Sequence, residues 1–245
     1  MAISVGNSAT SAALTAATGT SSTLSLNNNK TDVIVQVSIR DTRTAATATV
    51  TYGGDAMTSD ITRLRVDGDS TADLRVYIFR KTGAKTGAND IVVTLDVAAD
   101  YWAFSGTAVS GISSTGQPEV TGGADADLTA GTDPSVTMTT TTGDTIRFDS
   151  VYNKSGTSMT AGSSQTIIGQ VSTNGGSDRA LFGYIIYTSS GSNTSTWTET
   201  ADDDWCMVSA AYKIAAAVGG GGGLIGNNSA LIGSSILLEK SALIN

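Results

Sequence analysis

Residues 31–40, TDVIVQVSIR, decide the fold class of this chain. Every second side chain of the stretch is apolar, and these residues are Val33, Val35, Val37 and Ile39. Alternation with a period of two is typical of a β-strand that buries one face against a core. The stretch therefore predicts a strand with one buried face.

Other stretches extend the same pattern along the chain. Residues 74–80, LRVYIFR, are apolar on nearly both faces, as expected of a central strand. Alternating or β-branched runs between Gly- and Asn-rich turns predict strands near 45–52, 91–95, 101–110, 135–140, 145–152, 165–171, 180–188, 194–199 and 205–215. Residues 111–134, which hold Pro118 and Pro134, predict a polar loop, and residues 1–26 predict an edge strand or an arm.

Many short strands with regular turns favour an all-β fold. We expect residues 1–218 to form one body, an antiparallel two-sheet β-sandwich, and the number of strands suits a jelly-roll-like arrangement. Five consecutive glycines, Gly219 to Gly223, then interrupt the chain, because glycine has no side chain to pack and the most conformational entropy to lose.

The segment after the glycines, 224–245, is too apolar for a solvated tail and too short for a core of its own. It predicts an arm that docks on another subunit, and the alternative is a last strand that folds back on its own body. The expected anchors of this assembly interface are Leu224, Ile225, Leu231, Ile232, Leu237, Leu238, Leu243 and Ile244.

Composition excludes several classes of function. Only 15% of the residues are charged, so Thr, Ser, Asn and Gly must cover the surface. The net charge of −8 predicts no nucleic-acid partner, and no run of apolar residues is long enough to predict a membrane span. The N-terminal residues lack the basic and apolar regions of a secretory signal, so we expect synthesis in a host cytoplasm.

The residue types needed for most catalysis are missing. Histidine is absent, which excludes Ser-His-Asp, Cys-His and His-ligated metal chemistry. The single cysteine, Cys206, lies between Trp205 and Met207 and predicts a buried small hydrophobe. We expect no enzyme, and a glycan hydrolase with paired carboxylates is the weakest of the alternatives.

Closely spaced carboxylates are the only candidate metal ligands. Clusters of this kind can bind Ca²⁺ through loops, although none follows the EF-hand spacing, and solvated acidic turns are the simpler interpretation. We expect no cofactor, with Ca²⁺ as the alternative; its ligands would come from Asp67, Asp69, Asp125, Asp127, Asp202, Asp203 and Asp204.

Exposed aromatic rings would indicate recognition of a surface sugar. The candidates are Tyr101, Trp102, Tyr184, Tyr187 and Trp197. Trp197 lies in the polar sequence SNTSTWTET and is the best candidate for an exposed ring. The simpler interpretation is that its ring covers a sheet edge or a subunit contact.

The chain resembles a family of β-sandwich domains in structural proteins of tailed bacteriophages and prophages. The resemblance is carried by TVTYGGDAMT (49–58), LRVYIFRKTGAKTGANDIVVTL (74–95), YWAFSGTAVSGI (101–112) and the Leu-Leu-Glu sequence at 237–239. It implies a component of a virion. It departs from the family pattern at Arg80-Lys81, where a proline is common.

These observations predict an accessory virion protein, such as a capsid decoration protein or a tail or fibre component. It would act by non-covalent assembly with itself and with other virion proteins. We expect a homo-oligomer; the sequence leaves open whether it is a trimer and whether it belongs to the head or the tail. The alternative is a receptor- or glycan-binding module on the same particle.

Overall fold

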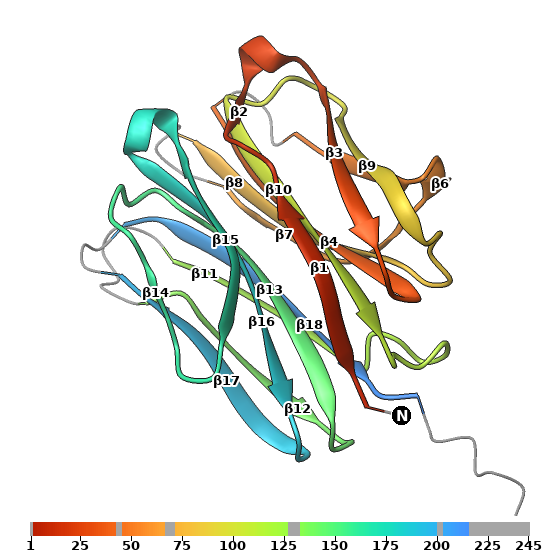
Figure 1. Ribbon diagram of the computed structural model, residues 1–245. Helices are drawn as coiled ribbons and strands as arrows, with labels where there is room; N and C mark the ends of the chain where they lie inside the picture. Colours follow the sequence, from red (N-terminus) through yellow and green to blue (C-terminus); the bar gives the residue numbers. More distant parts are fainter. Residues whose placement is uncertain (1, 43–45, 67–71, 127–132, 200–202, 216–245) are drawn as a thin grey trace, which may run out of the picture. The chain divides into compact units, whose positions relative to one another are not determined.

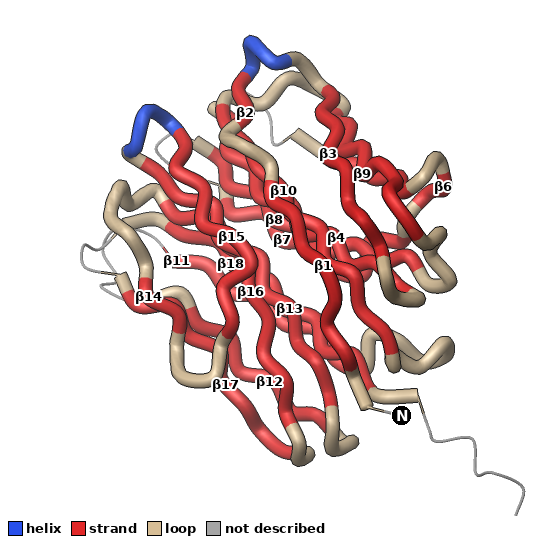
Figure 2. The backbone as a smooth tube through the Cα atoms, in the orientation of Figure 1, coloured by secondary structure: helices blue, strands red, loops and turns tan. Residues whose placement is uncertain are grey.

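The structure, a computed structural model, is built almost entirely of antiparallel β-strands (Figures 1 and 2). It describes residues 2–42, 46–66, 72–126, 133–199 and 203–215. Two short 3-10 turns, η1 (Ala16–Thr18) and η2 (Asn174–Gly176), lie at the same end of this body. Within these ranges, no helix is long and apolar enough to cross a membrane.

The N-terminal half of the body contains two sheets. Sheet I consists, in spatial order, of β3 (Ser21–Asn28), β9 (Gly87–Leu95), β5 (Ala48–Tyr52) and β6 (Asp55–Ala56). Sheet II consists of β1 (Ser4–Thr10), β10 (Tyr101–Ser110), β4 (Asp32–Asp41), β8 (Asp73–Lys81) and β7 (Thr58–Arg65), with β2 (Leu14–Thr15) also paired to β10. We call this half the N-terminal sandwich.

The C-terminal half contains two further sheets and is called the C-terminal sandwich. Sheet III consists of β11 (Val120–Ala126), β18 (Trp205–Lys213), β13 (Thr145–Asn153), β16 (Asp178–Tyr187) and β15 (Thr166–Thr173). Sheet IV consists of β12 (Ser135–Thr140), β17 (Gly191–Thr198) and β14 (Thr160–Ala161).

The four sheets lie in layers in the order I, II, III, IV, and an apolar core fills each of the three spaces between them (Figure 1). The first core joins sheets I and II through residues such as Val37, Phe79 and Val93. The second joins sheets II and III through residues such as Val76 and Phe182. The third joins sheets III and IV and contains both Trp197 and Trp205.

The stacking corrects the prediction for residues 31–40. Strand β4 buries both faces, because sheet II has a neighbouring sheet on each side. Its valines face sheet I, whereas Ile34 faces sheet III. The polar Gln36 on the second face is satisfied by hydrogen bonds: its amide donates to the main-chain oxygen of Gly183 (3.1 Å), and its oxygen accepts from Ser105 (3.1 Å). Alternating polar residues therefore did not mark a solvent face.

The two sandwiches have the same topology. The sheet II order β1-β10-β4-β8-β7 corresponds strand by strand to the sheet III order β11-β18-β13-β16-β15. The order β3-β9-β5 of sheet I likewise corresponds to β12-β17-β14 of sheet IV. Eight strands wound in this way, as two Greek keys, form a jelly roll. The chain therefore contains two jelly rolls in tandem.

The contact between the two jelly rolls is reciprocal. Strand β1 lies against β15 and its counterpart β11 lies against β7, while β10 lies on β16 and its counterpart β18 lies on β8. The equivalent central strands β4 and β13 contact each other. This is the pattern of an isologous interface with two-fold pseudosymmetry, here formed within one chain.

Details of the strands support the equivalence. Strands β7 and β15 each carry a register shift at their start, between Ser59 and Ile61 and between Ile167 and Gly169.

Strand β11 corrects the prediction that residues 111–134 form a loop. Its Gly122 and Gly123 resemble turn residues in the sequence, but both lie in a strand that pairs with β18. A β-carbon at Gly122 would lie 2.8 Å from Val136 of sheet IV. Glycine is therefore required here by the close approach of two sheets rather than by a turn.

The prediction of an antiparallel all-β sandwich is confirmed. The described residues form four sheets, where the sequence predicted two, because each tandem jelly roll brings its own pair. Within residues 1–26, Ser4–Thr10 form the edge strand β1, which pairs only with β10 in sheet II. The predicted arm, 219–245, lies outside the described residues.

Candidate functional site

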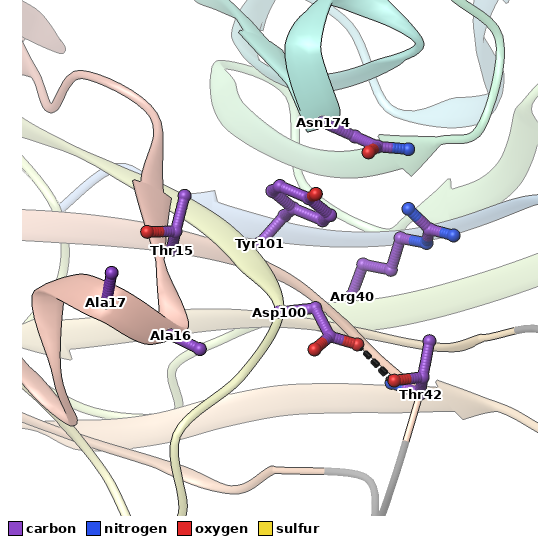
Figure 3. Close-up of a pocket in the computed structure, with 8 residues that line it drawn as sticks. All are labelled: Thr15, Ala16, Ala17, Arg40, Thr42, Asp100, Tyr101 and Asn174. Carbon is purple, nitrogen blue, oxygen red and sulfur yellow. Dashed lines mark hydrogen bonds between the residues drawn. The ribbon is translucent and has the colours of Figure 1, made fainter.

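A polar pocket of about 500 Å³ opens at the end of the body where η1 and η2 lie (Figure 3). It draws on both sandwiches, since Asn174 comes from η2 and the other lining residues come from the N-terminal sandwich. The pocket is lined by Thr15, Ala16, Ala17, Arg40, Thr42, Asp100, Tyr101 and Asn174.

Arg40, near the end of β4, is held in place by residues of the C-terminal sandwich. Its Nη1 lies 3.0 Å from a carboxylate oxygen of Asp178 on β16. The same oxygen accepts a hydrogen bond from the buried Tyr152 hydroxyl (3.1 Å). Burial raises the pKa of Asp178, although the Arg40 guanidinium acts in the opposite direction. The buried Nε of Arg40 has no hydrogen-bond partner in the structure.

Tyr101 and Asp100 form another wall of the pocket. The guanidinium of Arg40 lies over the Tyr101 ring, 5.6 Å from its centroid, in a cation–π arrangement. Asp100 accepts a hydrogen bond from the main-chain N–H of Thr42 (2.8 Å) and another from the Thr42 hydroxyl. The strand pairing of β4 with β10 brings these residues together, because Tyr101 lies directly opposite Arg40 in the register.

Asn174 completes the rim from the other sandwich. Its backbone φ is +49°, in the left-handed region that asparagine tolerates better than most residues. Its amide donates to the second carboxylate oxygen of Asp178 (3.3 Å). Asp178 thus orients both Arg40 and Asn174, and the pocket presents a rigid set of planar polar groups.

The pocket can offer hydrogen bonds but little charge. Arg40 and Asp178 neutralise each other, and Asp100 adds one carboxylate. An aromatic ring with a few convergent polar groups is the usual composition of a site for a small molecule, and the volume lies within the range of about 300–1,000 Å³ for such sites. The two carboxylates do not converge on one point, since Asp178 is engaged by Arg40, Tyr152 and Asn174.

A buried polar cluster lies elsewhere, in the C-terminal sandwich. Arg147 and Asp149 on β13 are fully buried between sheets III and IV, with Nε of Arg147 2.9 Å from Asp149. Asp149 also accepts hydrogen bonds from Ser195, Ser209 and Gln165. The charges of Arg147 and Asp149 are thus paired with each other inside the protein, and this pair links sheets III and IV.

The described carboxylates among the Ca²⁺ candidates are engaged in ion pairs or in a hydrogen bond to the main chain. Asp204 is buried and pairs with Arg65 (2.9 Å) and Lys154 (2.6 Å), and Asp125 pairs with Arg63. Asp203 accepts a hydrogen bond from the main chain of Asp204. No group of three potential metal ligands occurs in the part of the chain that the structure describes. The other candidates, Asp67, Asp69, Asp127 and Asp202, lie outside that part.

Trp197, the best candidate in the sequence for an exposed aromatic ring, is buried. Its side chain is 0% exposed and lies in the third core. The side of strand β17 that carries Trp197 faces sheet III. Gly183 of that sheet leaves room for the ring, since a β-carbon at Gly183 would lie 2.9 Å from it. Trp102 is also fully buried. Of the aromatic candidates, Tyr101 is the one that lines the pocket.

The sequence did not indicate the partners of Tyr101. Arg40 and Asn174 are 134 positions apart (40 and 174) and lie in different sandwiches. The one local signal was the run Asp100-Tyr101 at the start of a predicted strand. The predicted assembly anchors, Leu224 to Ile244, lie outside the described residues.

Comparisons with models of protein families, with curated proteins and with solved structures found no match to this chain.

Proposed function

We propose that this protein is a structural accessory component of a bacteriophage-type virion, which acts by non-covalent assembly and by presenting its β-sandwich body on the particle. The observation that carries the proposal is a body with three cores of its own, followed in the sequence by a glycine run and an apolar segment. The resemblance of 49–58, 74–95 and 101–112 to phage structural domains favours the same role.

The described body forms both jelly rolls from residues 4–213, so the apolar segment is not needed to supply a strand to either of them. Burial of each Leu or Ile contributes about 1.5–3 kcal/mol, and a partner subunit can provide that burial for several at once. A tether of five glycines lets the segment reach a neighbour. We therefore propose docking in trans, in a homo-oligomer or on another virion protein.

The polar composition of the body suits display on a particle. Exposed hydroxyls cover sheet IV, for example Thr137 and Thr194, whose oxygens are 2.7 Å apart. Few charges are available for ion-pair networks between subunits, and exposed pairs contribute only about 0–1 kcal/mol each. Association should therefore depend on apolar and main-chain contacts and should survive molar sodium chloride.

The test is light scattering of the full chain beside three variants. One ends at residue 218, one carries Leu231→Ser, Ile232→Ser, Leu243→Ser and Ile244→Ser, and the matched control carries Asn227→Ser and Asn228→Ser. We expect the first two to keep a β-type circular dichroism spectrum and to lose self-association or particle binding, while the control keeps both. A truncated chain that no longer folds would show that the segment belongs to its own body.

A further inference from the structure

We infer that the pocket formed by Arg40, Asp100, Tyr101 and Asn174 binds an uncharged saccharide. The site is distinct from the apolar segment on which the proposed assembly function depends, so either inference can fail without the other.

The lining groups match the chemistry of a polyhydroxylated ligand. Each sugar hydroxyl can both donate and accept a hydrogen bond. Asp100 offers an acceptor, Arg40 offers donors, and the Asn174 amide offers both. The Tyr101 ring and the methyl groups of Ala16 and Ala17 add an apolar surface for the C–H face of a sugar ring.

The polar groups are held before any ligand arrives. Asp178 holds Arg40 at 3.0 Å and Asn174 at 3.3 Å, and the main chain of Thr42 holds Asp100 at 2.8 Å. Groups fixed in this way lose little side-chain entropy on binding.

Charge decides between classes of ligand. The positive charge of Arg40 is balanced by Asp178 at 3.0 Å, and Asp100 adds a negative charge to the wall. Among the described lining residues Arg40 is the one cation, and its pairing with Asp178 leaves little positive charge to attract an anionic ligand. A metal ion would find only Asp100 as a lining carboxylate, since Asp178 is engaged by its three neighbours. The remaining class is neutral and rich in hydroxyl groups.

Among the described residues, the pocket occurs on one side of the pseudo-two-fold axis only. The corresponding place on the other side of the axis, at the same end of the strands, is formed by the end of β13, the start of β18 and the end of β7. There, Asp204 at the start of β18 pairs with Arg65 and Lys154, and all three groups are largely buried. In the N-terminal sandwich, by contrast, Asp100 and Tyr101 at the start of β10 line the pocket. The two jelly rolls have diverged at this position.

The test is saturation-transfer NMR of the full chain with a panel of neutral sugars, offered both as free reducing sugars and as methyl glycosides. Glucuronate, sialic acid and inorganic phosphate serve as anionic probes. We expect saturation transfer from the protein to neutral sugars at millimolar concentration and none to the anionic probes. If a methyl glycoside binds as well as the free sugar, the natural ligand would be a terminal residue of a surface glycan. If methylation abolishes binding, the natural ligand would be a free sugar.

Two substitutions locate the binding. Tyr101→Ala removes the ring, and Asn174→Gly removes the amide at a φ of +49° that glycine adopts without strain. Each should weaken binding by about tenfold, the equivalent of about 1.4 kcal/mol. Tyr101→Phe should retain most of it. Ser164→Gly, at a comparable φ of +68° on another loop, is the matched control and should bind as the parent does.

Three results would overturn the inference. They are the absence of binding by every neutral sugar of the panel, a preference for the anionic probes, and affinity that is unchanged in both Tyr101→Ala and Asn174→Gly. Melting temperatures of the unliganded variants separate a lost contact from a lost fold. Because the experiment does not depend on self-association, a chain that stays monomeric can still give a positive result.

Discussion

The hydroxyl oxygens of Ser38 and Ser150 lie 3.0 Å apart between the two jelly rolls. Each donates to the main chain of the opposite strand: Ser38 to the oxygen of Val151 (3.0 Å) and Ser150 to that of Val37 (3.1 Å). The two serines are 112 positions apart (38 and 150). Asp32, at the start of β4, and Asp144, just before β13, have the same separation. They mark the pseudo-two-fold axis and link the two halves through the backbone.

This link should be measurable as a coupling. Ser38→Ala and Ser150→Ala each remove one hydrogen bond to a buried carbonyl that also lies in a central strand, so each should lower the free energy of unfolding by about 0.5–1.5 kcal/mol. The double variant should lose less than the sum, since the two hydroxyls contact each other. Urea unfolding of the four proteins gives the cycle. Strict additivity would mean that the pair does not act as a unit.

The buried Arg147–Asp149 pair should be costly to break and less costly to replace. Asp149→Ala leaves the Arg147 charge buried without its carboxylate, so we expect a loss of about 3–5 kcal/mol in unfolding free energy. In β4, the equivalent strand of the N-terminal sandwich, Val35 and Val37 lie 112 positions before Arg147 and Asp149. Introducing Arg147→Met together with Asp149→Val should therefore recover part of the loss. A double variant less stable than Asp149→Ala would contradict this reasoning.

Cys206 is buried, as its neighbours in the sequence predicted. Burial, together with the charge of Asp125, raises the pKa of its thiol to about 12. The native protein should therefore resist alkylation by iodoacetamide at neutral pH and should react once it is unfolded in urea. Cys206→Ala should cost only about 1 kcal/mol. Rapid labelling of the folded chain, or covalent dimers on non-reducing gels, would contradict this prediction.

Glu119 should contribute stability that depends on pH. Desolvation opposes its charge, but hydrogen bonds from the hydroxyls and main chain of Thr141 and Thr142 prevail and lower its pKa below 4.5. A lowered carboxyl pKa stabilises the fold above the unfolded value, and that stability is lost as the pH falls through the folded value.

Glu119→Gln should therefore lower the melting temperature at neutral pH and have less effect at acid pH, below the folded pKa of Glu119, where the parent carboxyl group is protonated and uncharged like the glutamine amide. Asp90→Asn, which removes one charge from an exposed position of β9, is the matched control for net charge. An equal effect of Glu119→Gln at both pH values would exclude ionisation as the cause.

The sequence by itself determined many of the strands. Alternation and β-branched residues predicted β4, β8, β10 and β13 within a few positions, because the period of two is a local property of a strand. It also determined that Cys206 packs in a core.

Tertiary structure decided which faces are buried. In sheet II, Gln36 and Ser38 look like solvent-facing residues, yet a second jelly roll covers them and satisfies their polar groups. Trp197 lies in a polar sequence but points into the third core. The pocket joins Arg40, Tyr101 and Asn174 because strand pairing and the packing of two sandwiches bring them together. Contacts between residues so far apart in the chain depend on the folded arrangement, and no local pattern encodes them.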